Sequence, residues 1–359
     1  MKLESGRGET GGCCYSGNLR RWVLIVTLVF TAIAVPCLVL NNTVYPFLLL
    51  RHSSYSMENG KGKLGRVLKE AAMEDNTVII TTLNEAWATP GSIFDLFLES
   101  FLIGNQTKHL LDHLVVVALD QKAYNSCLAV HSHCFALTTK DVDFSGQEKY
   151  FMSPDYLKMM WRRIHFLRSV LQLGYNFVFT DADIMWFRDP FPRLYKDADF
   201  QISCDRFNGN SLDSNNAPNG GFTYVKSNKR TMKFYKFWYL SKNTHPGLHD
   251  QDVFNMIKHH PFITLIGLKM RFLSTTYFGG FCETSKDLNQ VCTMHANCCA
   301  GLDRKVHDLK VMLEDWRTYV SQPTAVKRSN SLSWRVPQLC WETFHQRPLK
   351  RKVPKEKKG

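Results

Sequence analysis

Apolar runs alternate with amphipathic stretches between residues 78 and 187. The first run, VIITTLN (Val78–Asn84), is rich in β-branched residues, and apolar residues then recur at helical spacing over Gly91–Ile103. The same order continues, with further strands expected over Leu114–Asp120, His133–Thr139 and the beginning of Tyr175–Phe187, and further helices near Lys122–Val130 and over Pro154–Leu173. The pattern therefore predicts strands that alternate with helices.

The expected strands of this half are continuous apolar runs, which is typical of a mostly parallel sheet covered by helices on both faces. The pattern loosens further on, where we expect strands over Ala198–Cys204, Gly220–Ser227 and Leu265–Leu273, and helices over Lys229–Lys242 and Asp250–His259. The GxGxxG pattern of Gly60–Gly65 does not follow an expected strand and GxxxxGK does not occur, so no Gly-rich phosphate loop supports a nicotinamide-cofactor enzyme or a kinase. We expect one α/β, Rossmann-like domain over residues 77–345.

An uncharged apolar stretch lies near the N-terminus, over residues 22–40. Its length matches the roughly 20 apolar residues that cross a bilayer, and Arg20 and Arg21 before it place residues 1–21 in the cytosol by the positive-inside rule. The run is long for a cleaved signal peptide. We therefore expect an uncleaved type II anchor, followed by a stem over residues 41–76.

The net charge of +13 is concentrated partly in a basic C-terminal tail, residues 346–359. Such a charge run is typical of a solvated, disordered segment. No basic face interleaved with aromatic residues and no nucleic-acid-binding module is recognisable, so nucleic acid is not an expected partner.

Eight of the 11 cysteines follow the predicted span, an even number that suits disulfides in an oxidising lumen. We expect Cys127 to pair with Cys134, and a disulfide cluster between Cys282 and Cys299. Of the two N-glycosylation sequons, Asn41 adjoins the membrane, which leaves Asn105 as the credible acceptor.

The motif TDAD (Thr180–Asp183) ends the buried run YNFVF. Ligands of parallel α/β sheets gather at the carboxyl ends of strands. There, Asp181 and Asp183 can both reach a hard Mn²⁺ or Mg²⁺ ion, which in turn can neutralise a diphosphate. Asp189 before Pro190 is better interpreted as a turn former.

Two other segments carry residues suited to a sugar diphosphate. In NAPNGGF, Gly220 and Gly221 would let a sugar approach the backbone and Asn219 could bind its hydroxyls, although Asn-Gly is also an ordinary hairpin turn. Lys158 and Arg162 share one helix face that suits a diphosphate, or else form an exposed basic stripe.

These motifs resemble a known family. The segments LGYNFVFTDADIMWFRDPF, NAPNGGFTYVKSN, HDQDVFN and MHANCCAGLDRKVHDL are similar to the plant nucleotide-diphospho-sugar transferases of glycosyltransferase family 77 over about residues 77–320. The resemblance implies a GT-A fold, retention of anomeric configuration, Mn²⁺ dependence and residence in the Golgi membrane.

The resemblance also implies roles for particular residues. His295 in MHANCC would be the third metal ligand beside Asp181 and Asp183, although Cys292, His295 and Cys298 also have a spacing that could bind zinc. Polar side chains at the end of the first strand would receive uracil and ribose, namely Thr81, Thr82 and Asn84.

In HDQD, the resemblance implies that Asp250 holds donor hydroxyls and that Gln251 lies at the reactive face of the sugar. A double displacement would need a carboxylate nucleophile, Asp250 or Asp252, whereas a front-face mechanism needs none. Asp250 could instead be merely a helix N-cap.

The expected function is transfer of a sugar, arabinose or xylose by resemblance, from a UDP-sugar to a cell-wall glycan or glycoprotein in the Golgi lumen. Two alternatives are a catalytically silent sugar-binding or scaffolding subunit of a Golgi transferase complex, and a luminal metal-dependent hydrolase. The oligomeric state in the Golgi, homo- or hetero-oligomer, stays open.

Overall fold

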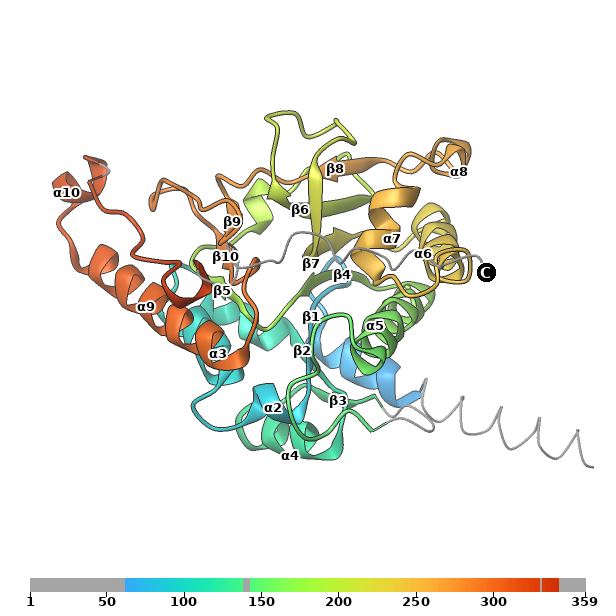
Figure 1. The fold of residues 1–359 in the computed structure, drawn as a ribbon, viewed down its shortest axis with the longest axis horizontal. Coiled ribbons are helices and arrows are strands. Elements are labelled where there is room, and N and C mark those ends of the chain that lie inside the picture. The colour runs from blue at the N-terminus through green and yellow to red at the C-terminus, as the bar shows by residue number, and fades with distance from the viewer. Residues whose placement is uncertain (1–61, 138–142, 330, 342–359) are drawn as a thin grey trace, which may run out of the picture. The chain divides into compact units, whose positions relative to one another are not determined.

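The computed structural model describes residues 62–137, 143–329 and 331–341 (Figure 1). The predicted cytosolic segment, the span over residues 22–40 and the basic tail lie outside the described residues. Among the residues that are described, no helix has the length and apolar character needed to cross a membrane.

A sheet of seven described strands forms the centre of the domain, in the order β3-β2-β1-β4-β7-β6-β8. β7 runs antiparallel to both of its neighbours, whereas the other ladders of this sheet are parallel. The mixed, mostly parallel sheet predicted from the sequence is thus confirmed. The strands are β1 (Thr77–Leu83), β2 (Leu114–Ala118), β3 (Cys134–Ala136), β4 (Asn176–Thr180), β6 (Phe200–Arg206), β7 (Ala217–Val225) and β8 (Met270–Phe272).

Helices cover both faces of this sheet, as predicted. Successive strand side chains point to opposite faces, so Val78 and Ile80 of β1 enter one apolar core and Ile79 enters the other. The first core is closed by α5 (Pro154–Gln172), α6 (Lys229–Ser241) and α7 (Asp250–Ile257), and the second by α3 (Ile93–Ile103), α4 (Gln121–Val130) and α9 (Leu302–Ser321), as Figure 1 shows.

A helix over residues 62–71 differs from the expected stem. Leu64, Leu68 and Ala71 lie on one face of this helix and are buried in the same core as α5. Because three apolar side chains at helical spacing leave water there, this part of the expected stem belongs to the folded domain.

The run expected as one strand over Tyr175–Phe187 is divided by the aspartates. β4 ends at Thr180, and β5 (Ile184–Trp186) leaves the main sheet to pair with β10 (Thr293–His295), which also pairs with β9 (Phe278–Gly280). This second sheet brings the HANCC segment beside TDAD.

The remaining elements are short. The stretch Leu265–Leu273, expected as a strand, is strand only at β8, because α8 (Pro261–Leu265) starts at a proline in its first turn and ends close to Gly267, whose φ is +63°. The others are α2 (Glu85–Ala88), α10 (Thr324–Arg328) and the 3₁₀ turns η1 (Lys108–His113) and η2 (Phe191–Arg193).

Three disulfides join described cysteines. The predicted pair Cys127–Cys134 is confirmed. Cys282 pairs with Cys298 inside the expected cluster, but Cys299 pairs with Cys340, which lies outside it in the sequence. The pairing follows from the chain beyond α9, which returns along that helix.

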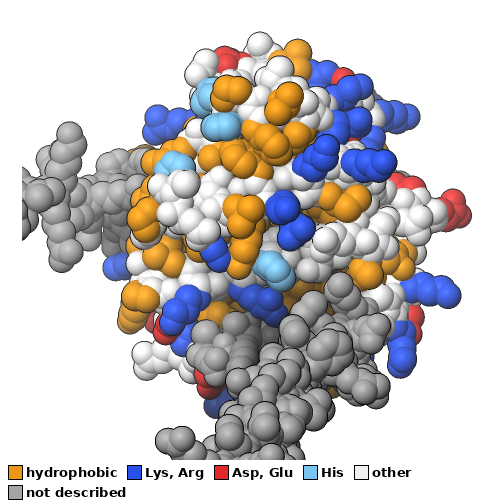
Figure 2. Space-filling view, turned by 90° about the vertical axis from the view of Figure 1, so that its right-hand side faces the viewer, with side chains coloured by type: hydrophobic (Ala, Val, Ile, Leu, Met, Phe, Trp, Pro, Cys, Tyr) orange, Lys and Arg blue, Asp and Glu red, His pale blue; other side chains and the backbone are white. Residues whose placement is uncertain are grey.

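Basic side chains also occur on the folded domain, over the face that carries α6 (Figure 2). Lys229, Arg230, Lys233 and Lys236 of this helix are exposed. The positive net charge therefore does not belong to the tail alone.

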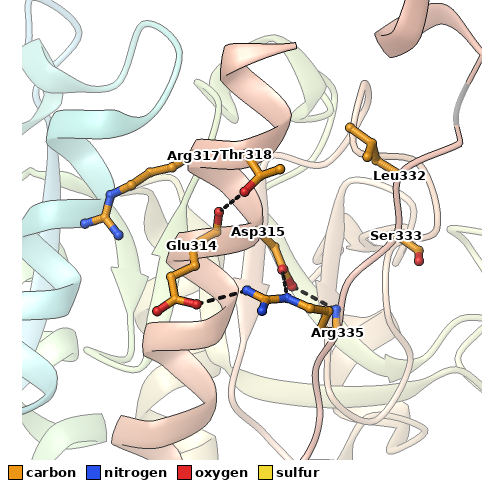
Figure 3. Close-up of a pocket in the computed structure, with 7 residues that line it drawn as sticks. All are labelled: Glu314, Asp315, Arg317, Thr318, Leu332, Ser333 and Arg335. Atoms are coloured by element: carbon orange, nitrogen blue, oxygen red, sulfur yellow. Dashed lines mark hydrogen bonds and ion pairs between the residues drawn. The ribbon is translucent and has the colours of Figure 1, made fainter.

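The C-terminal segment is held along α9 by carboxylates. Figure 3 shows the groove between α9 and this segment. The backbone N–H of Arg335 donates to Asp315 at 2.8 Å, and the Arg335 side chain donates to Asp315 and Glu314. These charged side chains satisfy one another, so we assign no ligand to this groove.

Asp308→Ala is expected to lower the free energy of unfolding by about 2–3 kcal/mol. The fully buried Asp308 carboxylate accepts the backbone N–H groups of Gln338, Leu339 and Cys340 at 2.9–3.1 Å, and its removal leaves these donors without their partner. Urea denaturation measures the effect. The control Asp303→Ala, an exposed carboxylate at the start of the same helix, should cost less than about 1 kcal/mol; equal losses would contradict the anchoring role.

Candidate active site

Asp181, Asp183 and His295 converge at the carboxyl end of β4. His295 Nε2 lies 3.2 Å from Asp183 Oδ1 and 3.9 Å from Asp181 Oδ2, and one ligand atom from each residue falls within 4.8 Å of the others. The Asp183 side chain is 1% exposed, whereas that of Asp181 is 26% exposed. The structure thus assembles the three residues that the sequence suggested as metal ligands.

Lys305 of α9 places a positive charge beside the buried Asp183 carboxylate. Its Nζ lies 2.5 Å from Asp183 Oδ2. Burial alone would raise the pKa of Asp183, but the Lys305 ammonium and the His295 ring hold it well below its usual range. Asp183 is therefore ionised at neutral pH, the form in which a carboxylate ligates a metal.

Lys305→Met is expected to tighten Mn²⁺ binding about tenfold, because the Lys305 ammonium repels a second cation and occupies one oxygen of Asp183. Calorimetric titration of the purified protein with Mn²⁺ measures this change. Lys310→Met, an exposed lysine of the same helix, should leave the affinity unchanged. Weaker binding by Lys305→Met would show that the lysine supports the ion rather than opposing it.

Arg163 of α5 bridges the metal cluster and α7. Its guanidinium donates to Asp181 Oδ1 at 2.9 Å and to Asp250 Oδ2 at 2.6 Å, over the ring of Phe179. Burial and the nearby Asp183 raise the pKa of Asp181, against the lowering effect of Arg163. Because Asp181 must lose its proton to ligate a metal, binding should weaken as the pH falls.

The two basic residues expected at the diphosphate, Lys158 and Arg162, lie on a different face of α5 from Arg163. Lys158 is 57% exposed and pairs with Asp155, and Arg162 is half-buried beside His165. The signal for Arg163 was its position on the apolar stripe of the helix, since Met160, Ile164 and Leu167 around it are buried. A charged residue on such a stripe needs a buried partner.

β7 forms the wall opposite Arg163. Asn219, Gly220 and Gly221 lie within this strand, so the hairpin-turn alternative is wrong, because β7 continues along β6 through register shifts instead of turning there. A side chain at Gly221 would meet His295 Cε1 at 2.5 Å and Asp181 Oδ2 at 2.8 Å. Only glycine leaves the space between these two residues open.

Asp205 at the end of β6 connects the polar residues of this wall and was missed from the sequence. Its carboxylate accepts from Asn219 and Asn297 at 2.8 Å and from Gln251 at 3.2 Å. Gln251 Oε1 in turn accepts the backbone N–H of Gly220 at 3.0 Å. Asp205 follows directly on the strand expected over Ala198–Cys204, and its position there offers no local signal of this role.

At the start of α7, His249 occupies the N-cap position and Asp250 is the first helical residue. The N-cap interpretation of Asp250 is therefore wrong, because its carboxylate turns to Arg163. Asp250 Oδ1 is buried without a hydrogen-bond partner among the described residues. Asp252 is 45% exposed and pairs with His249 at 2.8 Å.

The residues expected around uracil close β1. Thr81 is buried in the strand, Thr82 is half-buried, and Asn84 is the N-cap of α2. β1 adjoins β4 on the side away from β7. These residues and the β7 residues Gly220 and Gly221, which we call the glycine wall, thus flank TDAD on opposite sides.

The zinc alternative for His295 needs Cys298 as a thiolate ligand. This is wrong, because Cys298 is bonded to Cys282. Cys292 is a buried thiol whose sulfur lies 3.7 Å from the Gln290 carbonyl oxygen. The imidazole of His295 faces the carboxylates instead.

The profile of the nucleotide-diphospho-sugar transferase family matches residues 109–309, more than half of the chain. The chain belongs to this nucleotide-diphospho-sugar transferase family. It is a nucleotide-sugar-dependent glycosyltransferase, and its matched residues include the aspartates, the glycine wall, HDQD and His295.

Several relatives come from Arabidopsis thaliana. The chain is 54% identical over 297 residues to the uncharacterised protein At4g15970, covering 82% of this chain and 78% of that protein. It is 41% identical to the uncharacterised protein At1g28695, covering 93% and 98%. Arabinosyltransferase XEG113 is 26% identical over 212 residues, which are 54% of this chain and 30% of that protein.

Proposed function

We propose that this transferase moves a pentose, arabinose or xylose, from a UDP-sugar to a cell-wall glycan or glycoprotein acceptor, with a divalent metal held by Asp181, Asp183 and His295. The observation that carries the proposal is the convergence of these three side chains at one strand end. Similarity to an arabinosyltransferase supports the choice of pentose.

The residues present fit a metal of the Mn²⁺ or Mg²⁺ type. Carboxylate oxygens are the ligands that such hard ions prefer, and Gly221 keeps the space between Asp181 and His295 free of a side chain. When bound, the ion would neutralise the diphosphate and stabilise the charge that develops on the leaving UDP.

The neighbouring residues would position the donor sugar. Asp250 Oδ1, which has no hydrogen-bond partner in the described part of the chain, is a suitable acceptor for a sugar hydroxyl, because a buried oxygen without a partner is costly. Arg163 fixes the other oxygen of this carboxylate, and the Gly220–Gln251 hydrogen bond fixes the amide that faces the wall. Retention of configuration and a Golgi membrane location belong to the same proposal and rest on the family resemblance.

The test is release of UDP by the purified protein from UDP-arabinose, UDP-xylose, UDP-galactose and UDP-glucose. We expect turnover of one pentose donor with Mn²⁺, a loss of about a hundredfold or more after chelation, and recovery on adding Mn²⁺ back. Donor binding without UDP release would instead support the non-catalytic subunit. Free sugar as the sole product, with acceptor in excess, would support the hydrolase.

A further inference from the structure

The segment over residues 143–153 touches the elements that surround the site. The Gly146 N–H donates to Glu85 of α2 at 2.6 Å, and Glu148 accepts the Leu302 N–H at the start of α9 at 2.9 Å. At its far end, the Phe151 ring lies 5.3 Å from the ring of His249, the N-cap of α7. Because α9 carries Lys305 and α7 carries Asp250, this segment lies against two helices that supply residues of the site.

Phe151 is the outermost of three rings, which we name the aromatic cluster: Phe151, Tyr156 and His249. The Phe151 centroid lies 5.3 Å from Tyr156 and 5.3 Å from His249, and Tyr156 lies 6.3 Å from His249. His249 is buried at the start of α7, with its Nδ1 2.8 Å from Asp252 Oδ2, so the inner end of the cluster is packed inside the domain. Phe151 itself is 59% exposed.

An exposed aromatic ring that packs on a buried ring beside a polar site is suited to bind a sugar. One face of a sugar ring presents C–H groups, which pack on the electron-rich face of an aromatic ring, while its hydroxyls remain free for polar partners. His249 directly precedes Asp250, so a sugar on Phe151 would adjoin the position proposed for the donor sugar.

We propose that the aromatic cluster is the acceptor subsite, on which Phe151 stacks the terminal sugar ring of the acceptor glycan. The proposal rests on the transferase function proposed above and adds the position and the recognition chemistry of the second substrate. The strand order favours the acceptor over uracil as occupant. The residues expected around uracil end β1, whereas α7 packs against β7, on the other side of β4.

The test compares Phe151→Ala with the wild-type protein, both with UDP and Mn²⁺ present. Binding of arabinotriose, xylotriose and cellotriose is measured by saturation-transfer NMR, and UDP affinity by calorimetry. We expect Phe151→Ala to weaken binding of the preferred trisaccharide about tenfold and to leave the UDP affinity unchanged. Phe151→Trp should restore binding. Leu265→Ala, which removes an 81% exposed apolar side chain on α8, should have no effect.

Three outcomes would overturn the proposal: unchanged trisaccharide binding in Phe151→Ala, weakened UDP binding in that variant, or no trisaccharide binding by the wild-type protein. Failure of the transferase function is a separate observation, because it would appear as absence of UDP release from every donor by the wild-type protein. Phe151 is mostly exposed, so its truncation leaves both apolar cores intact, and a thermal melt verifies this.

Discussion

Asp183→Asn is expected to reduce metal-dependent turnover of the UDP-sugar by about a thousandfold. Asp183 is buried and ionised, and it is the carboxylate on which both His295 and Lys305 converge. The amide has nearly the same shape but no charge, so the ion loses an anionic ligand while Lys305 keeps its positive charge. UDP release over a range of Mn²⁺ concentrations measures the loss and shows whether more metal recovers it.

Asp189→Asn provides a matched control six residues further along the chain. The Asp189 carboxylate accepts the Phe191 N–H at 2.9 Å, which confirms its interpretation as a turn former. An asparagine can accept the same hydrogen bond, so turnover should stay close to that of the wild-type protein. Equal losses in the two variants would contradict a specific metal role for Asp183.

Gly221→Ala is expected to lower turnover by about a hundredfold, although it adds a single methyl group. The new Cβ would lie 2.5 Å from His295 Cε1, 2.8 Å from Asp181 Oδ2 and 2.9 Å from Asn219 Oδ1. Real Cβ contacts are longer, so the imidazole and the carboxylate must separate and the ligand set opens. Calorimetric Mn²⁺ titration should show the loss directly.

Gly220→Ala tests whether any methyl group on this wall would do the same. Its Cβ would meet Arg163 Nη2 at 3.7 Å and Gln251 Oε1 at 3.9 Å, which are ordinary contacts. Mn²⁺ affinity should therefore be retained in this variant, whatever happens to donor binding. If both variants bound Mn²⁺ like the wild-type protein, the ion would not lie between Asp181 and His295.

The features that could be predicted from the sequence were local. β1 and α5 have strong periodicity over many residues, and their bounds in the structure lie within two residues of those expected. The position of Asp181 and Asp183 after a buried strand followed from the same pattern. His295 was different, because only the family resemblance connected it with aspartates so distant in the sequence.

The features that could not be predicted depend on contacts between distant segments. Arg163 was recognisable as basic, but only the packing of α5 shows that it faces Asp250 rather than solvent. Asp205 acquires its role from a strand, a helix and the segment after β10 that meet there. The pairing of Cys299 with Cys340 required the return of the chain along α9, which no periodicity encodes.

Some residues of the proposed site lie within loops closed by disulfides, and others do not. Asp181 and Asp183 lie outside every disulfide-closed loop of the described chain, whereas His295 lies inside the loop closed by Cys282–Cys298 and Lys305 inside the loop closed by Cys299–Cys340. A protein made in a reducing cytosol would hold these two residues by noncovalent packing alone. The oxidising capacity of the expression host therefore decides whether a preparation reports on the chemistry of the site or on its incomplete assembly.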